Sequence, residues 1–213
     1  HTSKQQVIRI DKDSGEMPTE GERNRLLQHL MDIGPSMDAF IVSDYGHGTV
    51  DGPVISYMRD AAKGKVVVGD ARYRLEDFKG FTLITPNESE AYALCGMEPG
   101  SDIGEVGARI VGFMDVAALL ITRGNRGMSL FMKDGTTRHI PISGKDDVTD
   151  VTGAGDTVCA AVTLSLAGGA DFYTACRVAN YAAGVVVMKR GTATLTVDEL
   201  KRAMEETNGS HRK

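Results

Sequence analysis

The sequence predicts an α/β fold in which a largely parallel central sheet carries helices on both faces. Segments rich in β-branched residues alternate with segments of helical periodicity through most of the 213 residues. Hydrophobic residues make up 41% of the chain and charged residues 25%, ordinary values for a globular protein. No apolar run approaches the ~18 residues that a membrane span needs. We therefore expect one large domain over residues 1–213, with 207–213 as a polar tail.

Short apolar or alternating runs predict the strands. The run "AFIVSDYG" ends in Asp and Gly, which suggests a buried strand and its loop, and "GMSLFMKDGTTRHIPI" suggests a hairpin with an Asp-Gly turn. The predicted strand segments, in chain order, are 5–11, 39–46, 65–71, the start of 81–96, 117–124 and the hairpin 127–142.

Apolar residues at helical spacing predict the helices between and after these strands. A polar loop over 14–22 precedes the first of them, Gly64 closes the second, and a capping box of Thr196 and Glu199 opens the last. The predicted helices are 23–34, 50–64, the end of 81–96, 103–114, 157–169, 172–191 and 197–206.

Charge and cysteine usage narrow the class of protein. The net charge of −5 and the lack of a Lys/Arg cluster argue against a nucleic-acid partner. The first residues are polar and carry no signal-peptide apolar region. Cys95, Cys159 and Cys176 are odd in number and scattered, which predicts reduced, packed thiols in a cytoplasmic protein with no membrane partner.

Polar residues and glycines fall at the ends of the predicted strands. In open α/β sheets, ligands bind outside the carboxyl ends of the strands. The strand-end candidates for one shared crevice are Asp44, Asp70, Asn87, Thr122 and Gly124.

The stretch "DVTGAGDTV" places two aspartates around a Gly-Ala-Gly turn, directly before an apolar helix. A helix N-terminus presents unpaired N–H groups and partial positive charge, and small residues let an anion approach them. Asp156 in the first turn has two interpretations: it complements the helix dipole, or it serves a phosphate site. A carboxylate beside a phosphate is repelled unless a cation or a proton transfer is involved, which describes a general base in phosphoryl transfer.

Two further stretches each have a structural and a functional interpretation. In "TPNESE", the sequence alone favours a helix start with Asn87 as N-cap and Glu90 at the third position, and the alternative is a magnesium site. In "ITRGNRG", the glycine-rich turn either leads into a hairpin or lets a nucleotide approach the backbone. The sequence contains neither a GxxxxGK[ST] P-loop nor a strand followed by GxGxxG, so a nucleotide site here is of another type.

Together these segments resemble the ribokinase-like (pfkB) family of carbohydrate kinases. "DVTGAGD" is similar to the family's C-terminal signature, "PNESE" to its N-x-x-E magnesium motif, and "TRGNRG" to its nucleotide-binding strand and turn. Within the family, "QQVIRID", "VSDYGHG" and "ANYAAGVVVMKRGTATLT" resemble, in order, segments of D-glycero-β-D-manno-heptose 7-phosphate kinases. The likeness extends to about Glu206 and implies a three-layer, ribokinase-like fold.

The resemblance implies a kinase that uses ATP and Mg²⁺ to phosphorylate a sugar hydroxyl, with heptose 7-phosphate giving heptose 1,7-bisphosphate. Asp156 would be the base and the N–H groups of Gly153, Ala154 and Gly155 the anion hole. The other implied site residues are Asn87 and Glu90 for Mg²⁺ and phosphates, Thr122, Gly124, Gly127 and Asn180 for the nucleotide, Asp150 for a monovalent cation such as K⁺, and Asp44, Asp70 and Arg72 for the substrate.

The chain also departs from the family. Members are substantially longer, so we expect residues 1–11 to be the last strand of a lid and the preceding sugar-recognition strands to be missing. His47 stands where heptose kinases typically have lysine, and Ala71-Arg72 stands for Pro-Lys. Because the sequence stops at Lys213 in a polar tail, we expect the nucleotidyltransferase activity of bifunctional relatives to be missing from it.

Two alternatives stay open: a kinase for another sugar or nucleoside, and a catalytically incomplete nucleotide-binding fragment. Exposed sheet edges, and the lid contacts of family members, also predict a homo-oligomer, most simply a dimer.

Overall fold

The computed structural model describes residues 15–143 and 149–210, with side chains to residue 206. Its centre is a six-stranded sheet in the order β1-β2-β3-β4-β5-β6. The first four strands are parallel, and β5 and β6 are added antiparallel, so the predicted largely parallel sheet is confirmed. The strands are β1 Ala39–Asp44, β2 Val66–Ala71, β3 Leu83–Ile84, β4 Ala118–Thr122, β5 Met128–Met132 and β6 Thr137–Ile140.

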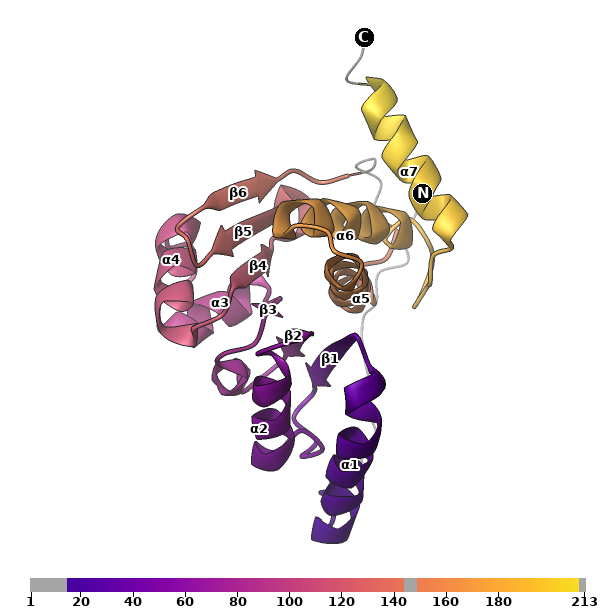
Figure 1. Cartoon of the computed structure of the whole chain (residues 1–213). Helices are drawn as coiled ribbons and strands as arrows, with labels where there is room; N and C mark the ends of the chain where they lie inside the picture. The colour runs from indigo at the N-terminus through magenta and orange to yellow at the C-terminus, as the bar shows by residue number, and fades with distance from the viewer. Residues whose placement is uncertain (1–14, 144–148, 211–213) are drawn as a thin grey trace.

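Helices cover both faces of this sheet, as predicted, and α7 lies outermost beside α6 (Figure 1). Helices α2, α3 and α4 pack on one face and α5 and α6 on the other. The helices are α1 Glu20–Ile33, α2 Gly52–Ala61, α3 Glu88–Cys95, α4 Ile103–Met114, α5 Ala154–Ala167, α6 Phe172–Val186 and α7 Val197–Ser210, with short 3-10 turns at Gly34–Ser36, Leu75–Phe78 and Gly124–Arg126.

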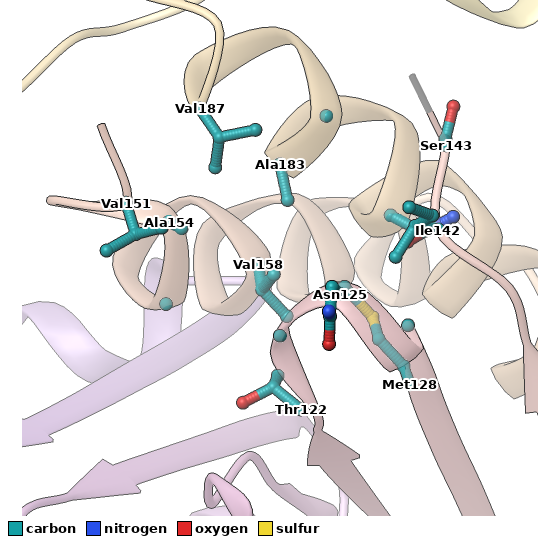
Figure 2. A pocket seen from close by; sticks show the side chains of 15 residues that line it. Thr122, Asn125, Met128, Ile142, Ser143, Val151, Ala154, Val158, Ala183 and Val187 are labelled. Atoms are coloured by element: carbon teal, nitrogen blue, oxygen red, sulfur yellow. The ribbon is translucent and has the colours of Figure 1, made fainter. Parts of the chain in front are cut away.

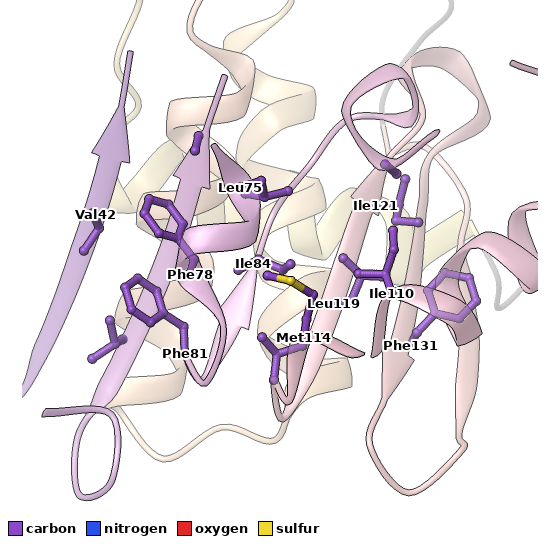
Figure 3. Close-up of a cluster of buried hydrophobic side chains, with 14 of the residues drawn as sticks. Val42, Leu75, Phe78, Phe81, Ile84, Ile110, Met114, Leu119, Ile121 and Phe131 are labelled. Atoms are coloured by element: carbon purple, nitrogen blue, oxygen red, sulfur yellow. The ribbon is translucent and has the colours of Figure 1, made fainter. Parts of the chain in front are cut away.

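The core is divided by the sheet because successive strand residues point to opposite faces. Val67 of β2 packs with α2 and α4, and the next residue, Val68, packs with α5 and α6. Leu119 and Leu120 of β4 divide in the same way. The first of these two clusters is drawn in Figure 3, where Phe78 and Phe81 stack with ring centroids 4.8 Å apart. Two-sided burial explains the continuous apolar runs of these strands.

Several element boundaries differ from the sequence prediction. Helix α1 begins at Glu20, inside the predicted loop 14–22, because Thr19 and Glu22 form a capping box. Helix α2 ends at Ala61, and Gly64 follows in a turn instead of closing the helix. Helix α6 ends at Val186, before the predicted limit of 191.

At the chain ends, α7 continues to Ser210, into the predicted polar tail. The predicted strand 5–11 lies outside the described residues.

The cysteine prediction is confirmed for all three residues. Cys95, Cys159 and Cys176 are free and buried. Burial raises the pKa of the Cys159 and Cys176 thiols to about 12, which keeps both protonated. None of the helices in the described ranges combines the length and apolar character needed to cross a membrane.

A substitution at Gly69 in β2 tests how closely the core packs against the strand that carries Asp70. A Cβ atom added at Gly69 would lie 2.4 Å from the Phe78 ring and 3.0 Å from the Phe81 ring. We expect Gly69→Ala to lower the free energy of unfolding by roughly 1–3 kcal/mol through overpacking. Urea unfolding measures the effect, with Gly52→Ala as the control because its Cβ would meet no atom within 4 Å. An equal, small effect of both substitutions would contradict this packing.

Candidate active site

The carboxyl ends of the parallel strands meet the N-terminus of α5 at one edge of the sheet. A cavity of about 550 Å³ lies there. Of the five strand-end candidates, the structure brings four together around it, and Gly124 lies in a neighbouring cavity instead. The residues lining the polar cavity are Ser43, Asp44, Tyr45, Asp70, Arg72, Thr85, Asn87, Glu90, Thr122, Val151, Gly153, Gly155 and Asp156.

Helix α5 begins at this cavity without a side-chain cap. Its N-cap residue, Gly153, has a φ of +78°, a backbone conformation that glycine adopts without strain. The N–H of Ala154 donates to the carbonyl of Val151 at 3.2 Å, so it has an acceptor within the chain, and its place in an anion hole stays a prediction. Within the described residues, the N–H groups of Gly155 and Asp156 have no acceptor, so these two groups are available to donate hydrogen bonds to a ligand.

Gly155 has no structural requirement for glycine. Its φ is not positive, and an added Cβ would meet no atom within 4 Å. Glycine inside a helix is less stable than alanine by roughly 0.5–1 kcal/mol. The space beside Gly155 opens into both cavities of the site, so a ligand explains the residue better than the fold does.

Carboxylates dominate the charge of the polar cavity. Burial, followed by the charges of Glu90 and Asp156, raises the pKa of Asp70 to about 6. Asp44 is almost fully buried at 5% exposure, and its Oδ1 accepts from the N–H of Gly46 at 2.9 Å. Arg72 is the one cationic side chain among the described residues that line this cavity. Such a site favours a cation, or an anion accompanied by one.

The start of α3 confirms the helix-cap interpretation of "TPNESE". The side chain of Asn87 accepts from the N–H of Glu90 at 3.0 Å, and Glu90 accepts from the N–H of Asn87 at 2.8 Å. This capping box orients both side chains at the cavity that they also line. The structural role and a ligand role therefore coexist at these two residues.

A second, mostly apolar cavity of about 250 Å³ adjoins the first and shares Thr122, Val151 and Gly155 with it (Figure 2). The sequence-predicted residues Gly124, Gly127 and Asn180 line it together with Thr122. Ala154, which the sequence placed in the anion hole, also lines this cavity. Its remaining lining residues, which sequence analysis missed, are Asn125, Met128, Ile142, Ser143, Val158, Ala183, Gly184 and Val187.

Close backbone contacts shape the walls of the apolar cavity. A Cβ at Gly127 would lie 2.1 Å from the carbonyl of Ile140, and one at Gly184 would lie 2.3 Å from the carbonyl of Ser143. Asn180, 7% exposed, donates its Nδ2 to the carbonyl of Pro141 at 2.8 Å. The small residues of "AAG" in α6 were the available sequence indication of a cavity on this face.

The arginines of "TRGNRG" serve the fold. Arg123 Nε pairs with Glu88 of α3 at 2.8 Å, and Arg126 pairs with the second oxygen of the same carboxylate. These ion pairs fasten the glycine-rich turn to α3 and leave its backbone facing the apolar cavity.

Asp150 also has a structural place. Its two oxygens accept from the N–H groups of Thr152 and Gly191 at 2.9 and 3.1 Å. The bond to Thr152 lowers the pKa of Asp150, and the carboxylate ties the segment before α5 to the chain after α6. Asp150 lines neither cavity, and His47 lies exposed in the loop after β1.

The chain is similar in sequence to known carbohydrate kinases. The pfkB family of carbohydrate kinases matches residues 64–199. A "Bifunctional protein HldE" of Geobacter sulfurreducens is 37% identical over 203 residues, covering 93% of this chain and 41% of the relative. The protein of that name from Shewanella sediminis is 37% identical over 207 residues, covering 96% and 43%. The chain thus spans about two fifths of the length of these curated relatives.

Solved structures agree on the fold. Phosphofructokinase-2 from Escherichia coli in complex with potassium aligns with a TM-score of 0.77 at 20% identity, covering 90% of this chain and 64% of that one. Arabidopsis thaliana ribokinase complexed with ribose and ATP aligns with a TM-score of 0.69 at 18% identity, covering 89% and 60%.

Fold and site together define a carbohydrate kinase domain of the ribokinase-like class. The match over most of the chain makes the assignment specific: the chain belongs to the pfkB family of carbohydrate kinases.

The raised pKa of Asp70 predicts how the free energy of unfolding depends on pH. Because its folded pKa of about 6 exceeds the ordinary value of 3.8, the stability linked to its proton is present at low pH and lost as pH rises through 6. We expect Asp70→Asn to be more stable than wild type by roughly 2 kcal/mol at pH 8, and by much less at pH 4.5. Urea unfolding at the two pH values, without divalent cations, measures the difference.

The control for this prediction is Asp115→Asn. A hydrogen bond from Lys133 lowers the pKa of Asp115, so its removal should reduce stability at pH 8, the opposite sign. An Asp70→Asn protein that is less stable than wild type at pH 8 would show that Asp70 is not strained by burial and like charge.

Proposed function

We propose that this chain carries the ATP side and the catalytic base of a sugar kinase that acts on a phosphorylated sugar, heptose 7-phosphate giving heptose 1,7-bisphosphate. The observation that carries the proposal is the position of Asp156. Its carboxylate lies at the uncapped start of α5, where the apolar and polar cavities meet. The similarity to heptose 7-phosphate kinase segments supports the substrate, and membership of the pfkB family supports the reaction class.

The two cavities suit the two substrates of the reaction, ATP and the sugar. The apolar cavity between the glycine-rich turn and α6 has the shape and chemistry for the base of ATP. A nucleotide bound there directs its phosphates past Gly155 toward the unpaired N–H groups of α5. The sugar then enters from the polar cavity, so that its hydroxyl and the γ-phosphoryl meet beside Asp156.

Asp156 would accept the proton of the attacking sugar hydroxyl. As the new bond from the sugar oxygen to phosphorus forms, the bond from the γ-phosphorus to the β-γ bridging oxygen breaks, and ADP leaves. The N–H groups of Gly155 and Asp156 would stabilise the negative charge on the transferring group. Asp156 thereby has a reason to stand beside a phosphate: it takes up a proton during the transfer.

The residues present fit a magnesium ion held mainly by phosphates. No group of three or more His, Cys, Asp or Glu side chains in the described part of the chain forms a complete metal cage. Asn87, Glu90 and Asp70 nevertheless line one cavity, in which burial and then the charge of Glu90 raise the pKa of Asp70. Mg²⁺ commonly binds through one or two carboxylates plus substrate phosphates and waters. When bound, the ion would neutralise phosphate charge, with Glu90 and Asn87 on its protein side.

Arg72 supports a phosphorylated substrate. It lines the polar cavity and also an adjacent cavity of about 410 Å³, so a sugar reaching from Asp156 toward that opening would place a distal phosphate near the guanidinium. This positive charge makes a sugar phosphate a better candidate than a neutral pentose, hexose or nucleoside. The second candidate function is a nucleotide-binding unit that turns over no sugar, and the separate apolar cavity supports it.

Sugar-dependent ADP release by the longest expressible form of the protein tests the proposed reaction. Heptose 7-phosphate, ribose, fructose 6-phosphate and adenosine would be offered with Mg²⁺, with and without K⁺. We expect turnover with heptose 7-phosphate and a loss of at least about a hundredfold in Asp156→Asn, because the base is removed. Nucleotide binding by Asp156→Asn, measured by calorimetry, should persist. ATP binding without turnover of any sugar would favour the nucleotide-binding unit instead.

Gly155→Ala separates the demands of the ligand from those of the fold. Because the position is helical and open, we expect alanine to raise the free energy of unfolding by about 0.5–1 kcal/mol. The same methyl group would narrow the passage between the cavities and weaken ATP binding by about tenfold or more. The control is Gly21→Ala, which is also at the second position of a helix, has no atom within 4 Å of an added Cβ and lines neither cavity. Unchanged ATP affinity in Gly155→Ala would contradict the proposed path of the phosphates.

A further inference from the structure

The carboxylate of Asp156 has one side-chain partner among the described residues. The hydroxyl of Tyr45 donates to Asp156 Oδ1 at 3.2 Å, across 111 positions of sequence. Tyr45 lies in the loop directly after β1 and lines the polar cavity. Its contact therefore joins the loop after β1 to the start of α5, at the carboxylate that we propose as the base.

The backbone around Tyr45 is held on both sides. Asp44, buried at the end of β1, accepts from the N–H of Gly46 at 2.9 Å and so closes a turn around Tyr45. Its carbonyl accepts from the N–H of Arg72 at 3.0 Å, which continues the pairing of β1 with β2. Gly46 has a φ of +80°, and an added Cβ there would lie 3.0 Å from the Tyr73 ring. Asp44 thus supports the loop, and because it also lines the polar cavity, the substrate contact expected from sequence stays a prediction.

The chemistry of the phenol suits a fixed donor. Tyr45 is 51% exposed, and its partial removal from water together with the Asp156 carboxylate raises its pKa, so the hydroxyl keeps its proton near neutral pH. An ionised carboxylate has two oxygens with about four acceptor positions. Donation to Oδ1 restricts rotation of the carboxylate and leaves Oδ2 and further lone pairs for another donor.

We propose that Tyr45 is a positioning residue, whose hydroxyl holds the Asp156 carboxylate so that a free oxygen lone pair faces the sugar hydroxyl. This inference rests on the proposed function, since it assumes that Asp156 is the base. A base that is fixed in advance does not have to be reoriented during the reaction, and small misplacements of such groups reduce rates strongly.

Tyr45→Phe tests the proposal in the kinase assay with the best sugar. We expect kcat to fall by about tenfold while the KM for ATP stays within twofold, because the apolar cavity is untouched. Tyr173→Phe is the control: this partly exposed tyrosine lies in α6, lines neither cavity, and no hydrogen bond of its hydroxyl is found in the described residues. A kcat within twofold of wild type in Tyr45→Phe, or an equal loss in Tyr173→Phe, would overturn the proposal.

A second measurement needs no turnover. The titration of Tyr45, obtained as the ultraviolet difference between the protein and its Tyr45→Phe variant, can be followed with Asp156 intact and with Asp156→Asn. Removing the negative charge should lower the titration midpoint of Tyr45. An unchanged midpoint would show that the two groups do not interact and would overturn the proposal.

The two measurements separate this inference from the proposed function. If Asp156→Asn lowers the midpoint of Tyr45 but the protein turns over no sugar, the Tyr45–Asp156 contact is supported and the assignment of Asp156 as a base is contradicted. If the protein turns over sugar but the midpoint is unchanged, the kinase reaction is supported and the Tyr45–Asp156 contact is contradicted.

Discussion

The start of α5 is the constraint on which the site depends. A helix that begins at a glycine with positive φ, with no side chain capping it, leaves N–H groups without partners. Gly155 and Asp156 are exposed, so these N–H groups are accessible from the polar cavity. Here the packing of Val158 and Val162 against the sheet fixes the helix, and the parallel strands bring their carboxyl ends to its open terminus. The fold thus holds in place a helix end whose N–H groups it does not itself pair.

Charge is distributed unevenly around this end. The partial positive charge of the helix start faces a cavity with several carboxylates and one arginine. Without ligands, the like charges and burial raise the pKa of Asp70 to about 6. A nucleotide with its magnesium ion would bring anionic phosphates to the helix and a cation to the carboxylates at the same time. The electrostatics of the empty cavity therefore match a pair of ligands better than either one alone.

Much of this arrangement could be predicted from sequence, because it follows from local rules. Parallel strands place Asp44, Asp70 and Thr122 at one edge once the alternating pattern is recognised. The capping box of Asn87 and Glu90 and the glycines before Asp156 are visible as short motifs. The roles of these residues in binding and catalysis remain proposals.

What sequence could not predict depends on contacts between distant segments. Tyr45 meets Asp156 only because β1 and α5 lie side by side, and nothing local to either residue indicates the pair. The apolar cavity needs α6 to approach the loop after β6, and the bond from Asn180 to Pro141 becomes visible only in three dimensions. The two arginines of the glycine-rich turn both pair with Glu88 of α3, which lies 35 positions from Arg123 in the sequence, and nothing local to the turn indicates this partner.

The glycines of the site show how fold and function can be told apart by steric argument. Gly127 and Gly184 stand where a Cβ would collide with backbone carbonyls, so their identity is explained by packing. Gly153 is explained by its positive φ. Gly155 has neither reason, and in a helix it destabilises the fold. Gly155 thus forms no turn and avoids no clash. It lies at the junction between the two cavities, so a ligand that passes there is the explanation we propose for this glycine.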